Sequence, residues 1–191
     1  MHLLIPLVTA ALLTTHGTLS AQEPNTTDYD EQAQAIIQQF ASTLKGELQT
    51  AIKEGGPVNA VSVCKERAPA IAASLSEQSG WDVGRTSLKL RNPSLNQPDD
   101  WERSILEQFE TRLANGEPAK TMSHAEVVET ASGKSYRYMK AIPTAEICLT
   151  CHGKELDPSL AEALDEAYPE DQARGYSAGD IRGAFTLHRP L

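Results

Sequence analysis

Basic residues are scarce in this sequence. Its 191 residues include 17 lysines and arginines against 26 aspartates and glutamates, so the formal net charge is −9. Because phosphate binding requires clustered Lys and Arg, this balance argues against nucleic acid as a partner. Hydrophobic residues make up 40% of the chain and charged residues 23%, which favours a packed core over global disorder. The length is typical of one domain with short appendages.

Long hydrophobic runs are absent beyond the N-terminus. The stretch "LLIPLVTAALLTTHGTLSA" has no Asp, Glu, Lys or Arg, and its apolar part, residues 3–13, is too short to span a bilayer comfortably. It predicts a signal peptide over residues 1–21, cut near Ala21, although Leu19 stands where a small residue is preferred. The alternative is an uncleaved anchor. We expect an exported, periplasmic protein with no membrane span after cleavage, and a disordered linker over residues 22–29.

Cysteine is also rare: there are three, and two of them lie in "EICLTCHG", residues 146–153. C-x-x-C-H is the attachment motif of c-type haem. Thiols at this spacing can each add to one vinyl group of the porphyrin, and the next histidine can bind the iron. The motif therefore predicts one covalent haem c, held by Cys148 and Cys151 and ligated by His152.

Three other readings of the motif compete with haem attachment. A thioredoxin-like redox pair comes early in a βαβ pattern, whereas this motif comes late and without a preceding aromatic residue. A zinc site needs further ligands, and Cys64 and His188 stand at irregular spacing. A disulfide between Cys148 and Cys151 would be strained. With a signal peptide present, we favour haem.

The sixth iron ligand remains open from the residues alone. The candidates are side chains with sulfur or imidazole donors: Cys64, Met122, Met139, His124 and His188. Methionines usually serve in packing. Cys64 lies on an apolar helical stripe beside the break expected at Pro69, and an unpaired cysteine is unusual in an exported protein.

Helical periodicity dominates the first half of the chain. Apolar residues share one face from Asp30 onward: Ala33, Ile36, Ile37, Phe40, Leu44, Leu48 and Ile52. Gly55-Gly56-Pro57 ends this helix, and a second, interrupted at Pro69, runs to Gly80. Asp99 with Glu102 predicts a capping box at the start of a third helix.

Strand patterns follow the helices. "WDVGRTSLKLRNP", residues 81–93, predicts a strand; residues 126–142 predict a hairpin with its turn at Ser132-Gly133. Asp157-Pro158 starts a short helix, and "GDIRGAFTLHRP" predicts a last strand. The order indicates an α+β fold with a mainly antiparallel sheet and N-terminal helices.

Three segments together resemble a known family. They are "VCKERAPAIAASLSEQSGWDVGRTSLKLRNPSLNQPDDWE", "CLTCHG" and "GYSAGDIRGAF". They are similar to the c-type haem domain with a PAS-like fold, found alone after a signal peptide or as the sensor part of bacterial receptors. The resemblance covers residues 30–191 and implies His/Cys ligation of the iron by His152 and Cys64. Because no kinase or receptor region follows in this sequence, a sensor would require a separate signalling partner.

This ligand set implies a low-potential haem, since thiolate stabilises ferric iron. Arg85, Lys89 and Arg91 would share one face of a regular strand and could pair with the haem propionates. The functions expected are redox sensing, sensing of a small gas such as NO or CO, or electron transfer to a redox partner protein, rather than catalysis. The alternatives are a four-helix electron-transfer cytochrome, a thiol-disulfide oxidoreductase and a small peroxidase.

Overall fold

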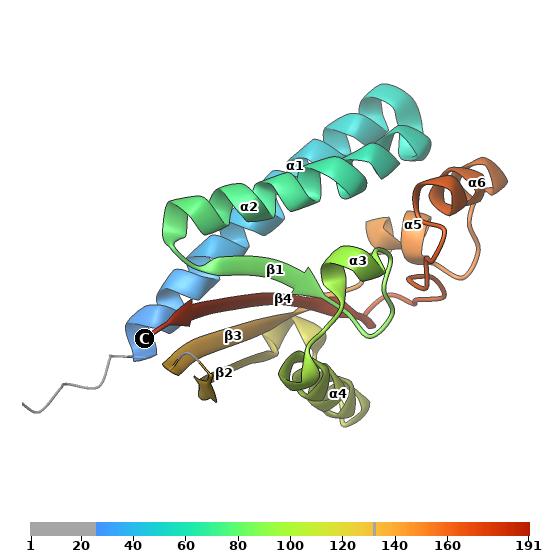
Figure 1. The fold of residues 1–191 in the computed structure, drawn as a ribbon. Coiled ribbons are helices and arrows are strands. Elements are labelled where there is room, and N and C mark those ends of the chain that lie inside the picture. Colours follow the sequence, from blue (N-terminus) through green and yellow to red (C-terminus); the bar gives the residue numbers. More distant parts are fainter. Residues whose placement is uncertain (1–25, 132) are drawn as a thin grey trace, which may run out of the picture.

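The computed structural model describes residues 26–131 and 133–191, so the predicted signal peptide and the turn residue Ser132 lie outside the described residues. Helices precede and flank a single sheet (Figure 1). The elements in chain order are α1 (Thr26–Ser62), the π-turn η1 (Val63–Arg67), α2 (Ala68–Ser79), β1 (Asp82–Thr86), α3 (Pro93–Asn96), α4 (Asp100–Ala114), η2 (Ala119–Thr121), β2 (Ser123–Thr130), β3 (Gly133–Pro143), η3 (Glu146–Cys148), α5 (Leu149–His152), α6 (Pro158–Ala167) and β4 (Ile181–Pro190).

The N-terminal helices form a hairpin. Gly56 adopts φ 75° and ψ −177°, outside helical geometry, and Pro57 follows it, so α1 folds back at the predicted break. The two arms are joined by the Arg67–Glu47 ion pair at 2.8 Å, and they lie together over the sheet (Figure 1). The helix begins at Thr26 rather than at Asp30, so the last part of the expected linker is helical.

The helical arm that carries Cys64 contains a π-turn. Ala68 donates its N–H to the carbonyl of Val63, five residues back. Pro69 lacks the N–H that an α-helix would direct to Lys65, which accounts for a distortion at this point. The predicted interruption is therefore confirmed, and Cys64 lies inside it.

The sheet is four-stranded and antiparallel, in the order β1-β4-β3-β2. Strand alternation gives it two apolar faces. One face packs against α1 and α2 through a cluster that includes Phe40, Trp81 and Tyr136. The other packs against α4, with Phe109 and Met139 fully buried. The α+β prediction is confirmed, and the four-helix bundle alternative is wrong.

Two local predictions have different outcomes. The capping box is confirmed: Asp99 accepts from the N–H of Glu102 at 2.7 Å, and Glu102 accepts from the N–H of Asp99 at 3.0 Å. The strand expected over residues 81–93 is too long, because β1 ends at Thr86. Over the described ranges, no helix combines the length and apolarity needed to cross a membrane.

Candidate functional site

The C-x-x-C-H segment leaves the sheet at a bulge. The register of β3 and β4 shifts between Ile142 and Pro143, and the chain then forms two short helices, η3 and α5. Cys148 is the N-cap of α5, whereas Cys151 and His152 lie within it. Gly153 ends the turn, where a Cβ would lie 2.5 Å from the carbonyl oxygen of Leu149. A residue without a side chain is therefore required directly after the histidine.

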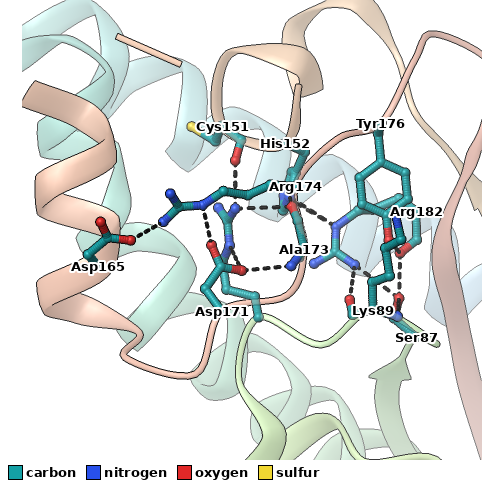
Figure 2. Close-up of polar contacts among 11 residues, drawn as sticks. Ser87, Lys89, Cys151, His152, Asp165, Asp171, Ala173, Arg174, Tyr176 and Arg182 are labelled. Carbon is teal, nitrogen blue, oxygen red and sulfur yellow. Dashed lines mark hydrogen bonds and ion pairs between the residues drawn. The ribbon is translucent and has the colours of Figure 1, made fainter. Parts of the chain in front are cut away.

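His152 is fixed by its Nδ1 atom. Nδ1 lies 2.7 Å from the carbonyl oxygen of Ala173, to which it donates in the neutral ring, and this leaves Nε2 as the lone-pair nitrogen (Figure 2). The Nε of Arg182 lies 3.2 Å from Nδ1 and 3.3 Å from Nε2. Burial, together with the charges of Arg182 and Arg91, holds the pKa of His152 well below its usual range. The ring is thus neutral at pH 7, the form that binds metals.

The fold gathers the three cysteines in one region, all as free, half-buried thiols. Burial raises the pKa of Cys151; ionised Cys64 and Cys148 would raise it further, whereas the charge of Arg91 lowers it. Cys64 comes from η1, far from the motif in sequence. Cys151 also packs against the apolar cluster of Val61 and Tyr168, which joins α1 to α6. Val61 lies three residues before Cys64, so the helical arm that carries Cys64 packs against the motif.

Arg85 and Lys89 have separate positions, which corrects the expected shared strand face. Arg85 lies at the end of β1, half-buried, with its guanidinium 5.3 Å from the ring centre of Phe40. Burial lowers the pKa of Arg85, and an ionised Cys64 would oppose that effect. Lys89 is exposed in the following loop, with Nζ 5.1 Å from the ring centre of Tyr176.

Arg91 is buried and held by protein groups, so it differs most from its predicted setting. Its Nε lies 3.1 Å from Oδ1 of Asp171, and the two side chains are 8% and 2% exposed. Its Nη2 donates to the carbonyl oxygens of Cys151 at 2.6 Å and Ala173 at 3.2 Å. The interpretation of Arg91 as a free propionate partner is therefore replaced by a role inside the protein.

The other candidate iron ligands have local partners of their own. Met122 and Met139 are fully buried in the cluster beneath α4. His124 lies 3.3 Å from a carboxylate oxygen of Glu126 on β2, and His188 lies 3.5 Å from Asp82 at the pairing of β1 and β4. In the part of the chain that the structure describes, no three His, Cys, Asp or Glu side chains are arranged as a metal-binding group.

Sequence reasoning missed the segment that faces the motif. Residues 171–177 run beside it: Gly175 donates to the carbonyl of Gly153 at 2.9 Å, and Tyr176 to that of His152 at 3.0 Å. Arg182, at the start of β4, also reaches Ser87 and the carbonyl of Lys89 (Figure 2). Arg182 lies within "GYSAGDIRGAF", one of the segments that carry the resemblance, and this was the only indication of its importance. A basic residue in a strand pattern does not indicate which groups it contacts.

The donors suit a c-type haem. Two free thiols stand at the required spacing, a neutral imidazole follows them with Nδ1 engaged and Nε2 as the donor atom, and a third thiol approaches from η1. Arg85 and Arg182 add two guanidiniums that, among the ion pairs of residues 26–131 and 133–191, have no carboxylate partner, unlike Arg91. Such groups suit an anionic ligand.

Comparison with known proteins gives one family. A family model described as Tll0287-like matches residues 22–190. Among solved structures, the cyanobacterial heme-protein Tll0287 matches with a TM-score of 0.65 and 23% sequence identity, over 88% of this chain and 98% of that one. At this identity the likeness shows the fold. A search of curated proteins finds no match.

Proposed function

The chain belongs to the Tll0287-like family, and from this membership and the site geometry we propose that it is an exported protein with one covalent c-type haem. Cys148 and Cys151 form the thioether links, and His152 and Cys64 bind the iron through Nε2 and Sγ. The haem supplies a one-electron couple at the iron. The solved relative is itself described as a haem protein, which supports the cofactor.

The observation that carries the proposal is the packing of the helical arm that bears Cys64 against the C-x-x-C-H turn, through Val61 and Cys151. A disulfide or thiol-redox pair would need only Cys148 and Cys151. Support for a third thiol comes from the distorted helix that carries Cys64, whose neighbour Val61 packs with Cys151, and His152 is held with Nδ1 hydrogen-bonded to a carbonyl. Hydrogen bonding at one ring nitrogen orients the other for a metal.

The chain's own residues would hold the haem carboxylates. Arg85 and Arg182 are half-buried guanidiniums without a carboxylate partner among the described ion pairs, and burial lowers the pKa of each. A partly desolvated cation is costly unless an anion accompanies it. The Nε–H of Arg182 and an iron atom cannot share the Nε2 lone pair of His152, so haem binding would release this guanidinium. Lys89, at the surface, is a third, weaker candidate.

The activity we propose is redox or gas sensing, or electron transfer, at low potential. A thiolate donates electron density and stabilises ferric iron. Cys64 lies in a π-turn, a less regular backbone than the helices around it, so its release on reduction would open the iron to NO or CO. A redox protein or separate signalling partner in the periplasm completes the proposal.

Absorption spectra test the function. Wild type and Cys64→Ala are expressed with the c-type maturation machinery and compared in ferric and ferrous form, with Ser62→Ala as matched control because Ser62 is the exposed N-cap of η1. We expect a low-spin spectrum with thiolate character in wild type and Ser62→Ala, lost in Cys64→Ala. Identical spectra for all three would remove Cys64 from the iron.

The attachment residues need their own test. We expect Cys148→Ala with Cys151→Ala to abolish the covalent mass increase of one haem, and His152→Ala to remove the low-spin spectrum. A wild-type chain that acquires no haem under maturation would overturn the proposal and favour a thiol-disulfide oxidoreductase. Unchanged ferrous spectra under NO and CO would remove the gas-sensing part alone.

A further inference from the structure

Arg91 contacts both chain segments that surround His152. Its Nη2 reaches the carbonyl of Cys151, within the motif, and the carbonyl of Ala173, in the facing segment. Its Nε is paired with Asp171, which precedes Ala173 by two positions. One guanidinium therefore joins the histidine-bearing turn to the segment that accepts the hydrogen bond of that histidine.

The carbonyl oxygen of Ala173 is shared by two donors. His152 Nδ1 lies 2.7 Å from it and Arg91 Nη2 lies 3.2 Å from it. A carbonyl oxygen has two lone pairs, so both contacts can form together. They are not independent, because a cationic donor withdraws electron density from the oxygen and makes it a weaker acceptor for the second donor.

Burial gives this contact its strength. Arg91 is 8% exposed, Asp171 is 2% exposed, and Ala173 is fully buried. Asp171 is held in turn by the N–H of Ala173 at 2.8 Å and by Nε of Arg174 at 2.8 Å. Polar interactions in such surroundings are screened far less than at the surface. The arrangement therefore fixes the position of the Arg91 guanidinium.

We propose that Arg91 is a positioning residue for His152, which, through the carbonyl oxygen they share, fixes the ring and weakens the hydrogen bond that Nδ1–H donates. This rests on the proposed function. A histidine whose Nδ1–H meets a strong acceptor becomes a more electron-rich ligand and favours ferric iron. Arg91 restrains that effect, and so raises the reduction potential above the value that thiolate and histidine would give without it.

The test compares Arg91→Met with Arg174→Met. Both variants remove one guanidinium from Asp171, but Arg174 contacts neither Ala173 nor Cys151 in the interactions that the structure gives it. We expect Arg91→Met to lower the reduction potential and to move the His152 Nδ1–H resonance of the ferrous protein downfield. Arg174→Met should leave the resonance at its wild-type position and shift the potential much less.

Two results would overturn the inference. Equal potential shifts with an unmoved Nδ1–H resonance in both variants would mean that Arg91 adds only its charge. A higher reduction potential together with an upfield shift of the Nδ1–H resonance in Arg91→Met would mean that Arg91 only holds the loop in place. If Arg91→Met fails to mature, Arg91→Lys replaces it. Lysine keeps the charge without the planar fork, so a smaller downfield shift is expected, and a resonance at the wild-type position would refute the proposal.

Failure of the proposed function is distinguishable from failure of this inference. Wild-type protein without haem under maturation would overturn the function. The Nδ1–H resonance of the haem-free full chain, compared between wild type and Arg91→Met, would then still show whether Arg91 acts on His152. If wild type binds haem but its Nδ1–H resonance does not differ from that of Arg91→Met, the inference alone would be overturned.

Discussion

Two regions of this molecule are held together by different forces. The helical hairpin meets the sheet through apolar and aromatic side chains, with Trp81 edge-on to Tyr29 and Tyr136 at ring-centre distances of 6.2 and 5.9 Å. The loop pair, residues 146–153 with 171–177, is joined by carbonyls, amides and guanidiniums instead. The first region buries the larger apolar cluster, and the second holds the C-x-x-C-H motif, to which the hairpin would add Cys64. The effects of substitutions in the two regions should therefore be separable.

The largest effect is expected from Trp81→Ala in the first region. Trp81 is 2% exposed, and its removal leaves a cavity between the hairpin and the sheet. Loss of a buried aromatic side chain costs about 3–5 kcal/mol. Chemical denaturation should show this loss, while the haem spectrum of the remaining folded protein stays that of wild type. Trp101→Ala, on a half-buried side chain of α4, is the control and should cost less.

The sequence made the first region predictable and the second largely not. The stripe from Ala33 to Phe40 repeats every three to four residues, which is sufficient to identify a buried helix face. No period identifies the partner of Arg91, because Asp171 belongs to a distant loop. The overlong strand has the same origin. Leu88 and Leu90 alternate as in a strand, but the side chain of Ser87 donates to the carbonyl of Arg182 and diverts the chain.

The candidate site could be proposed from the sequence where a motif fixes the spacing. Cys148, Cys151 and His152 follow from the motif itself, and the resemblance supplied Cys64. The supporting groups, Ala173, Asp171 and Arg182, act through backbone atoms or across the fold. Any residue could supply the carbonyl of Ala173, so no residue type marks it.

The second region should respond to Asp171→Ala almost as strongly. The substitution leaves the buried Arg91 without its carboxylate, and breaking a buried pair costs about 3 kcal/mol. Burial raises the pKa of Asp171, but the Ala173 amide and the charges of Arg91 and Arg174 outweigh it and lower the pKa below 3.8. A carboxylate with a lowered folded-state pKa stabilises above its ordinary pKa and loses that contribution as pH falls through the lowered value.

The measurement for Asp171→Ala is therefore urea denaturation at several pH values. The difference from wild type should be constant from neutral pH down to about 5 and shrink below 3.8. Asp165→Ala removes the exposed partner of Arg174, 68% exposed, and serves as control. A difference that is equally large for both variants would contradict the assignment of the effect to the buried pair.

A smaller and more local effect is expected from Gly153→Ala. The new Cβ would meet the Leu149 carbonyl oxygen at 2.5 Å, so the turn after His152 must shift. Such strain costs about 1–3 kcal/mol. If the proposed haem is bound, thioether formation and the low-spin spectrum should be impaired more than the free energy of unfolding is lowered. Gly46→Ala is the control, since its Cβ meets nothing within 4 Å in α1 and alanine favours helix. Normal maturation of Gly153→Ala would show that the turn tolerates the change.

The smallest effect is expected at the capping box, which belongs to neither region. Asp99→Ala removes the acceptor of the Glu102 N–H and should lower the free energy of unfolding by about 1 kcal/mol. Asp100→Ala, one residue on and also acidic, tests whether charge near the helix start rather than the cap is responsible. Neither variant should alter the spectrum or potential, because α4 packs on the sheet face opposite the hairpin and Cys64. A potential shift in Asp99→Ala would mean that the sheet transmits changes between its faces, and the separation of stability from chemistry argued above would then fail.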